Sequence, residues 1–257
     1  MIPPRLFFVL LAPMEFTFIH YLAVKSTAVT NPTYKTMLLT DSEPSGVWWD
    51  AVAPYVDAIK FVQAPTIING VRDPRTAHKA DHVRLNELHR NGGVYLDLDV
   101  ISVASLEPLM GYPTVLGGEG KDQKYGLCDA VILAEPASDF ITEWLRGYDS
   151  ATSLWSGFRS AGHDNYWDEM SSLYPAHLAR LHPDWIHVAD YRAFHYPTWE
   201  PADLELLFRG AGDAFPGAYA HHLWESESGA EYLSEITPDR LRTSNTNFSR
   251  ICQPFLD

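Results

Sequence analysis

The sequence predicts an α/β fold in which a largely parallel, twisted sheet is flanked by helices. Short apolar runs typical of buried strands alternate along the chain with segments of helical period. Turn signals such as Asn31-Pro32 separate the runs from the helical segments. This alternation favours parallel strands, because each helix returns the chain to the edge at which the previous strand began. The chain has 257 residues, which suits one domain, 1–257, with insertions.

The first apolar run, residues 6–11, is expected to be a strand. It follows Arg5 and so resembles a short signal peptide, but Pro3 and Pro4 are unusual there and no small-residue cleavage site follows. By the same apolar-run criterion, later strands are expected at 34–39, 59–62, 94–98, 114–116, 130–133 and 185–188. Helices are expected at 18–28, 48–52, 76–90, 139–148, 166–181 and 203–208.

The helix at 76–90 has the clearest end signals. Thr76 is a candidate N-cap, and Gly92-Gly93 are candidate stop residues. One face of this helix carries Ala77, Asp81, Arg84, Leu85 and Leu88. Asp81 and Arg84 are three residues apart and can touch. They form either a partly buried structural ion pair or the charged wall of a polar cavity.

Asp97 and Asp99 end the apolar run Gly93-Val94-Tyr95-Leu96 with one residue between them. If the strand continues through them, both side chains point to one face, with Cα atoms about 6.5 Å apart. Two carboxylates that close repel each other unless a cation lies between them. Oxygen ligands of this kind suit Mg²⁺ or Mn²⁺. The alternative is a strand that simply ends in an Asp-rich turn.

Composition narrows the classes of partner. The net charge of −14 argues against nucleic acid, although a metal ion and a nearby Arg can reverse the field inside a cleft. No stretch reaches the roughly 20 apolar residues that span a bilayer, so no transmembrane segment is expected. The chain has two cysteines, Cys128 and Cys252, and their spacing leaves open whether they pair.

Two ordered blocks, Ala77-His78-Lys79-Ala80-Asp81-His82-Val83-Arg84-Leu85 and Asn91-Gly92-Gly93-Val94-Tyr95-Leu96-Asp97-Leu98-Asp99, resemble the D-x-D glycosyltransferases of family 32. Further similar segments lie at 16–23, 44–50, 126–133 and 219–224, so the resemblance covers nearly the whole chain. It implies a GT-A (Rossmann-like) fold and a sugar-nucleotide-dependent enzyme. The expected reaction moves a sugar from a UDP- or GDP-sugar to a glycan, a lipid or another hydroxyl acceptor, with retention of anomeric configuration.

The resemblance also implies roles for individual residues. The expected ligands of Mn²⁺ or Mg²⁺ are Asp97, Asp99 and His222. The expected catalytic residues are Asp81, Arg84 and Asp129, and the expected donor-binding residues are Asp81, Arg84, Asp97 and Trp224. His222 stands two residues before Trp224, as in the family's His-x-Trp motif, and strand alternation turns its neighbour His221 to the opposite face. Asp129 stands where many family members have Asn, which puts the Asn role in doubt here.

Eukaryotic members of the family often carry a Golgi anchor. No bilayer-spanning stretch is found in this sequence, so we expect a soluble protein. It is expected to be cytoplasmic if bacterial, or to lie in the Golgi lumen if an anchor has been trimmed.

Two other functions compete with this one. A haloacid-dehalogenase-like phosphohydrolase also has a strand that ends in D-x-D, but it needs a later Lys and a second acidic cluster. Gly212-Asp213 is the only segment that resembles that second cluster. A non-catalytic sugar- or nucleotide-binding module could use the many Trp and Tyr side chains as carbohydrate platforms.

Overall fold

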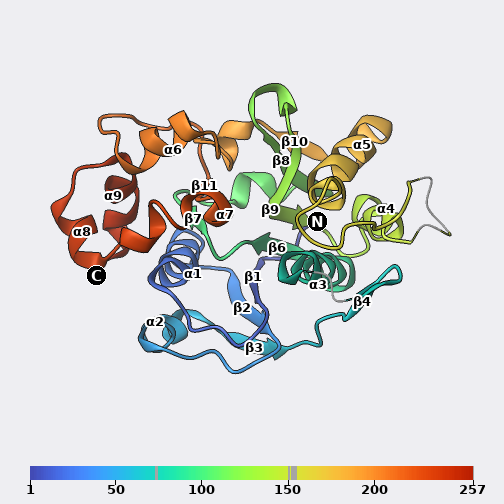
Figure 1. Cartoon of the computed structure of the whole chain (residues 1–257), viewed down its shortest axis with the longest axis horizontal. Coiled ribbons are helices and arrows are strands. Elements are labelled where there is room, and N and C mark those ends of the chain that lie inside the picture. The colour runs from blue at the N-terminus through green and yellow to red at the C-terminus, as the bar shows by residue number, and fades with distance from the viewer. Residues whose placement is uncertain (73–74, 150, 152–154, 257) are drawn as a thin grey trace.

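A twisted seven-stranded sheet forms the centre of the molecule (Figure 1). The computed structural model describes residues 1–72, 75–149, 151 and 155–256. Within them the strand order is β10-β8-β9-β6-β1-β2-β3. The strands are β1 (Arg5–Leu10), β2 (Lys35–Thr40), β3 (Ala58–Phe61), β6 (Gly93–Leu96), β8 (Thr114–Glu119), β9 (Gly126–Ala134) and β10 (His187–Ala189). The expected α/β architecture is confirmed, including a strand at the first apolar run.

The sheet is mostly but not wholly parallel. Parallel pairing joins β3, β2, β1 and β6 in turn, and also joins β10 to β8. β9 runs antiparallel to both β6 and β8. The cause is the short 3₁₀ turn Lys121–Gln123 between β8 and β9, because a connection of that length can only reverse the chain.

Helices cover both faces of the sheet, which is why β1 is apolar at every position from Leu6 to Leu10. Its alternate residues Leu6 and Phe8 pack into one core, and Phe7 and Val9 pack into the other. α1 (Phe18–Thr30) contributes to the first core. α3 (Thr76–Asn91), α4 (Asp139–Gly147) and α5 (Tyr174–Leu181) contribute to the second and lie together in Figure 1. The remaining helices are α2 (Val47–Val52), α6 (Pro201–Phe208), α7 (Glu225–Ser228), α8 (Pro238–Thr243) and α9 (Asn247–Cys252).

One predicted cap and several predicted boundaries are wrong. α3 begins at Thr76 as expected, but its N-cap is Arg75 and not Thr76, because Arg75 O already accepts the first helical N–H, from Lys79. The strand expected at 130–133 is longer and spans Gly126–Ala134. The helix expected at 166–181 begins at Glu169, with a π turn at Glu169–Leu173 that continues into α5. Before it, Asp164 accepts backbone N–H groups of Ala161 and Tyr166, which holds a turn in place of helix. The strand expected at 94–98 ends at Leu96.

The predicted stop after α3 is confirmed at Gly92 and Gly93, whose φ angles are 62° and 118°. A Cβ atom at Gly92 would lie 2.6 Å from Pro136 Cδ, and one at Gly93 would lie 2.9 Å from Arg5 O. Both positions therefore need glycine for backbone conformation and for close approach. The pair turns α3 directly into β6, so that the helix packs beside the strand that leads to Asp97.

Two small sheets were not predicted as paired strands. β4 (Ile67–Ile68) pairs with β5 (Val71–Arg72), and β7 (Val100–Ser102) pairs antiparallel with β11 (Ala220–His222). β7 follows β6 after the D-x-D segment, so this second pairing ties the C-terminal part of the chain to that segment.

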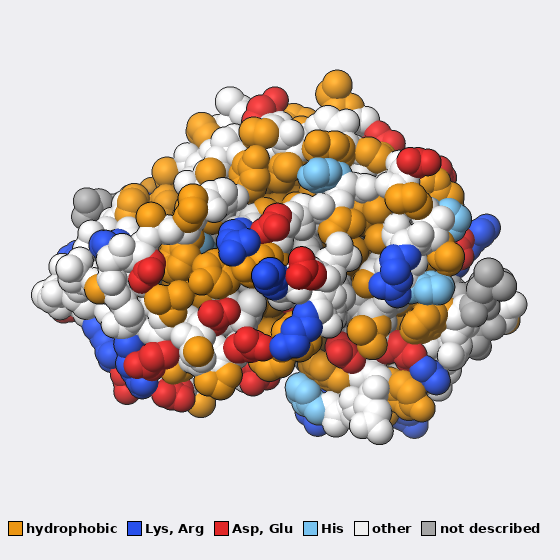
Figure 2. Space-filling view, turned by 90° about the horizontal axis from the view of Figure 1, so that it is seen from above, with side chains coloured by type: hydrophobic (Ala, Val, Ile, Leu, Met, Phe, Trp, Pro, Cys, Tyr) orange, Lys and Arg blue, Asp and Glu red, His pale blue; other side chains and the backbone are white. Residues whose placement is uncertain are grey.

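The surface in Figure 2 carries Lys and Arg side chains interspersed with Asp and Glu, with hydrophobic side chains between them. Exposed ion pairs of this kind, such as Lys35 with Asp57, contribute little to stability. Among the described helices, none has the length and apolar content needed to cross a bilayer.

Candidate active site

The D-x-D segment lies in a turn at the carboxyl end of β6. Asp97 N–H still donates to Ala130 O of β9 (2.9 Å), but Val100 N–H donates back to Asp97 O (3.1 Å). The expectation that Asp97 and Asp99 share one face of a continuous strand is therefore wrong. The turn nevertheless brings their carboxylates together with His222, the three ligand atoms all lying within 4.8 Å of one another.

β11 supplies His222 from far along the chain. Its pairing with β7 sets His222 opposite Val100, and Leu223 N–H donates to Asp99 O (2.9 Å). His222 Nε2 lies 3.3 Å from Asp99 Oδ2. His221 points the other way, as strand alternation predicts, and its Nδ1 lies 2.9 Å from Tyr196 O.

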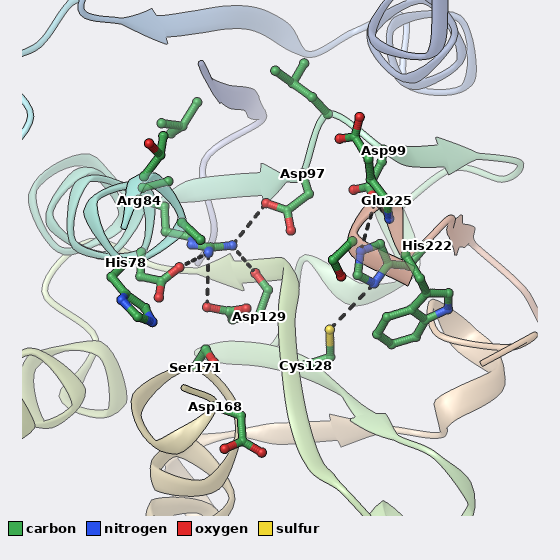
Figure 3. A pocket seen from close by; sticks show the side chains of 18 of the residues that line it. His78, Arg84, Asp97, Asp99, Cys128, Asp129, Asp168, Ser171, His222 and Glu225 are labelled. Atoms are coloured by element: carbon green, nitrogen blue, oxygen red, sulfur yellow. Dashed lines mark hydrogen bonds and ion pairs between the residues drawn. The ribbon is translucent and has the colours of Figure 1, made fainter. Parts of the chain in front are cut away.

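Arg84 of α3 contacts three of the four aspartates that the sequence predicted for the site, namely Asp81, Asp97 and Asp129 (Figure 3). Its Nη1 donates to Asp97 Oδ1 (3.1 Å) and to the backbone oxygen of Asp129 (2.9 Å). Its Nη2 contacts Asp81 and lies 3.2 Å from Asp129 Oδ2. Arg84 is 4% exposed and also stacks over the Tyr95 ring, 4.7 Å from the ring centre. One guanidinium thus orients three carboxylates at the end of β6.

Burial and charge shift the pKa values of these groups. Burial raises the pKa of Asp97, and raises that of Asp129 well above its usual range, although Arg84 opposes both shifts. Burial would also raise the pKa of Asp99, but His222 and the Glu225 N–H outweigh it and leave that pKa lowered. Burial would lower the pKa of His222, but Asp99 reverses the effect and raises it. Burial thus opposes ionisation of Asp97 and Asp129, whereas the contact between Asp99 and His222 favours the charged form of both.

These groups open into a cavity of about 570 Å³. Its wall includes residues 9–11 at the end of β1, as expected for ligand sites beyond the carboxyl ends of parallel strands. Its acidic lining residues are Asp81, Asp97, Asp99, Glu119, Asp129, Asp168, Glu225 and Glu227. Among the described lining residues, Arg84 is the one Lys or Arg.

Trp224 forms the wall beside His222. Its ring centre lies 4.0 Å from that of the imidazole, and its Nε1 donates to Pro197 O (3.0 Å). It also holds a left-handed backbone conformation (φ 57°, ψ 55°), which a bulky residue seldom adopts. That geometry starts α7 and places Glu225 N–H 2.8 Å from Asp99 Oδ2.

Several lining residues were missed by sequence reasoning, namely Glu225, Glu119, Cys128, Trp199 and His20. Glu225 acts on Asp99 through its backbone, which leaves no trace in residue type. Cys128 immediately precedes the predicted Asp129, and its Sγ lies 3.8 Å from His222 Nδ1. Its position next to Asp129 was the one feature of the sequence that could have identified Cys128 as a lining residue.

Residues 20–116 match the sequence model of a family described as "Glycosyltransferase sugar-binding region containing DXD motif", a span that includes Asp81, Arg84, Asp97 and Asp99. A curated relative, glucan organizing enzyme 1 of Cryptococcus neoformans, is 32% identical over 251 residues. The match covers 94% of this chain and 65% of that relative's length. The chain therefore carries a region similar to the DXD glycosyltransferase region and resembles one relative over nearly its whole length, while it spans less than two thirds of that relative.

Solved structures agree on the fold. The glycosyltransferase GlyE of Streptococcus pneumoniae aligns over 100% of this chain and 60% of its own, with a TM-score of 0.51 and 14% identity. The PaToxG glycosyltransferase aligns over 71% of this chain and 70% of its own, with a TM-score of 0.50 and 16% identity. The chain therefore has the GT-A type of fold expected from the sequence.

The phosphohydrolase alternative finds no support in these findings. Asp213, its candidate second acidic residue, lines a separate cavity together with His221 and Asn247. Asn247 Nδ2 donates to its Oδ2 at 3.1 Å.

Proposed function

We propose that this protein is a glycosyltransferase that moves a sugar from a nucleoside diphosphate sugar to a hydroxyl acceptor, with a divalent cation bound at Asp97, Asp99 and His222. The observation that carries the proposal is the convergence of these three side chains in a cavity large enough for a donor.

The three residues fit a divalent cation. Two carboxylates and an imidazole whose ligand atoms lie within 4.8 Å of one another are a normal ligand set, and the imidazole favours Mn²⁺ over Mg²⁺. When bound, the cation would act as a Lewis acid toward the departing diphosphate. The Glu225 N–H and Arg84 hold the Asp99 and Asp97 carboxylates in place where both residues line the cavity.

We expect the donor to bind along the cavity wall opposite His222. Asp81 and Arg84 line the cavity next to one another and can bond the sugar hydroxyls or a phosphate oxygen of the donor. In the present arrangement the Nη atoms of Arg84 already contact carboxylates, so its main effect is to set their orientation. Asp129 offers a carboxylate for the reacting region of the sugar. Trp224 provides an aromatic edge beside the metal ligands.

The acceptor is expected to be a carbohydrate or glycolipid. Tyr125 and Trp199 line the cavity with their ring centres 4.8 Å apart, an arrangement suited to packing against a sugar ring. The name of the Cryptococcus relative refers to glucan. We therefore propose a polysaccharide acceptor. We also propose that the transfer retains anomeric configuration, which ¹H NMR of the product's anomeric coupling tests.

The central test is metal dependence with a panel of UDP- and GDP-sugars. Release of nucleoside diphosphate should stop in EDTA and return with Mn²⁺. Asp99→Asn should lose this activity while circular dichroism stays that of the wild type, because the amide keeps the shape but loses the charge. Asp184→Asn, an exposed residue outside the cavity, is the matched control.

Activity that persists undiminished in EDTA would contradict the proposed cation. Mn²⁺-dependent donor binding without hydrolysis or transfer on any donor would instead indicate the binding module considered above.

A further inference from the structure

A second cluster of potential metal ligands lies behind His222. Cys128 of β9, His195 after the 3₁₀ turn Tyr191–Ala193, and His222 each offer one ligand atom, and these atoms lie within 4.8 Å of one another. Sγ of Cys128 lies 3.8 Å from Nδ1 of His222, on the side of the imidazole away from Asp99 (Figure 3). This cluster contains a thiol and two imidazoles and no carboxylate, unlike the Asp97-Asp99-His222 set.

His195 is the independent sign of a ligand. It is fully buried at 0% exposure, and neither of its ring nitrogens has a hydrogen-bond partner among the described residues. Burial lowers its pKa well below the usual value, so the ring is neutral and carries one free lone pair. A buried polar group with no partner is uncommon and calls for an explanation, such as an ion that it binds.

The spacing fits a tetrahedral cation that prefers sulfur and nitrogen. Zn²⁺ binds Cys sulfur at about 2.3 Å and His nitrogen at about 2.0–2.1 Å, which separates the two ligand atoms by about 3.6 Å. The Sγ–Nδ1 distance of 3.8 Å is close to that separation. Cys128 and His222 line the cavity, which gives the ion a path inward and a solvent ligand for the fourth position.

We propose that Cys128, His195 and His222 Nδ1 form a binding site for a thiophilic divalent cation of the Zn²⁺ class. Binding releases the thiol proton of Cys128, so the thiolate and two neutral imidazoles coordinate the ion. The nearby carboxylate of Glu119, which interacts electrostatically with both Cys128 and His222, favours the net positive charge of the loaded site.

His222 links this site to the donor cation, a consequence that rests on the proposed function. A neutral imidazole has one free lone pair, because its other nitrogen carries the proton. When Nδ1 ligates Zn²⁺, the proton resides on Nε2, which then faces Asp99 Oδ2 at 3.3 Å as a hydrogen-bond donor. Zn²⁺ therefore removes His222 from the Asp97-Asp99 ligand set and should inhibit donor turnover.

Cobalt spectroscopy tests the site without any donor. One equivalent of Co²⁺ added to the metal-free protein should produce a thiolate-to-cobalt band in the near ultraviolet, and Zn²⁺ should abolish it. Cys128→Ser should lose the band. Cys252→Ser, the other buried cysteine, should keep it. His195→Gln should weaken Co²⁺ binding at least tenfold, and the rise in melting temperature on adding Zn²⁺ gives a second readout for each variant.

Two further measurements separate this inference from the proposed function. The double variant Asp97→Asn/Asp99→Asn should keep the thiolate band, because it leaves the sulfur-containing site intact. Zn²⁺ inhibition of Mn²⁺-supported donor hydrolysis should be weaker in His195→Gln, relative to that variant's own activity without Zn²⁺. Absence of the band in the wild type, or its survival in Cys128→Ser, would overturn the site whether or not any donor is hydrolysed.

Discussion

Arg84→Lys is the most direct test of the carboxylate cluster. The guanidinium makes two contacts through Nη1, at 3.1 Å to Asp97 and 2.9 Å to Asp129 O. It makes two more through Nη2, to Asp81 and, at 3.2 Å, to Asp129 Oδ2. Lysine keeps the positive charge but offers one nitrogen in place of the planar fork. It cannot reach both sets of partners at once.

The magnitude follows from these contacts. A hydrogen bond to a charged group is worth about 1.5–3 kcal/mol, and the loss of one or two of them should cost about 2–4 kcal/mol after the side chains readjust. For a chain of this size that lowers the melting temperature by roughly 5–15 °C. Because Asp97 and Asp129 would lose their orientation, kcat/KM should also fall at least tenfold, which corresponds to about 1.4 kcal/mol in the barrier.

The assay pairs thermal melting with donor hydrolysis in Mn²⁺. Arg90→Lys on the same helix is the control, since Arg90 is exposed and a surface change of this kind is worth within about 0.5 kcal/mol. A lowered melting temperature with kcat/KM within threefold of wild type would make Arg84 a structural ion-pair residue only. An unchanged melting temperature would refute the reasoning from its contacts.

Three further predictions concern single side chains. His222→Ala should weaken Mn²⁺ binding in the presence of nucleoside diphosphate at least tenfold by isothermal titration, whereas His221→Ala, whose ring faces Tyr196 O, should leave it nearly unchanged. Burial raises the pKa of Asp129 above its ordinary 3.8, so its contribution to stability is present below that pH and is lost as pH rises through the folded-state pKa. Asp129→Asn should therefore melt above wild type in EDTA, by a margin that grows with pH, and a margin that shrinks would contradict this sign. Burial opposes ionisation of Glu87, but Lys60, whose Nζ lies 2.5 Å from Glu87 Oε2, outweighs burial and lowers the pKa of Glu87. Glu87→Gln should therefore lower the free energy of unfolding, measured in urea, by about 2 kcal/mol at pH 7 and by less as pH falls.

The sequence predicted the parts of the fold that depend on local pattern. The continuous apolar run of β1 and the Gly92-Gly93 stop each carry their own signal, and both elements occur where expected. The orientation of β9 was not predicted, because strands expected at 114–116 and 130–133 leave a connection long enough for either direction, whereas the observed strands extend toward each other until only a short turn separates them. The turn at Asp97 was one of two alternatives that the sequence left open, since an apolar strand gives no sign of the residue at which pairing ends.

The assembly of the site was the least accessible part. The D-x-D residues were named from the residue pattern and His222 from a resemblance, but their contact depends on the three-residue pairing of β7 with β11. Strands that short have no periodicity to detect. His195 had no signal at all, because its importance comes from the absence of partners in a folded interior, which no residue pattern records.

The charge of the cavity links stability to the proposed function. Arg84 is the one Lys or Arg among the described lining residues, and it already contacts three carboxylates. The remaining acidic side chains make one another's ionisation less favourable. The pKa of Glu225, for example, is raised first by burial and then by the negative charge of Asp99. A diphosphate entering this cavity alone would meet net repulsion. The proposed divalent cation at Asp97 and Asp99 would remove that repulsion and supply the attraction, so cation and donor should each strengthen the binding of the other.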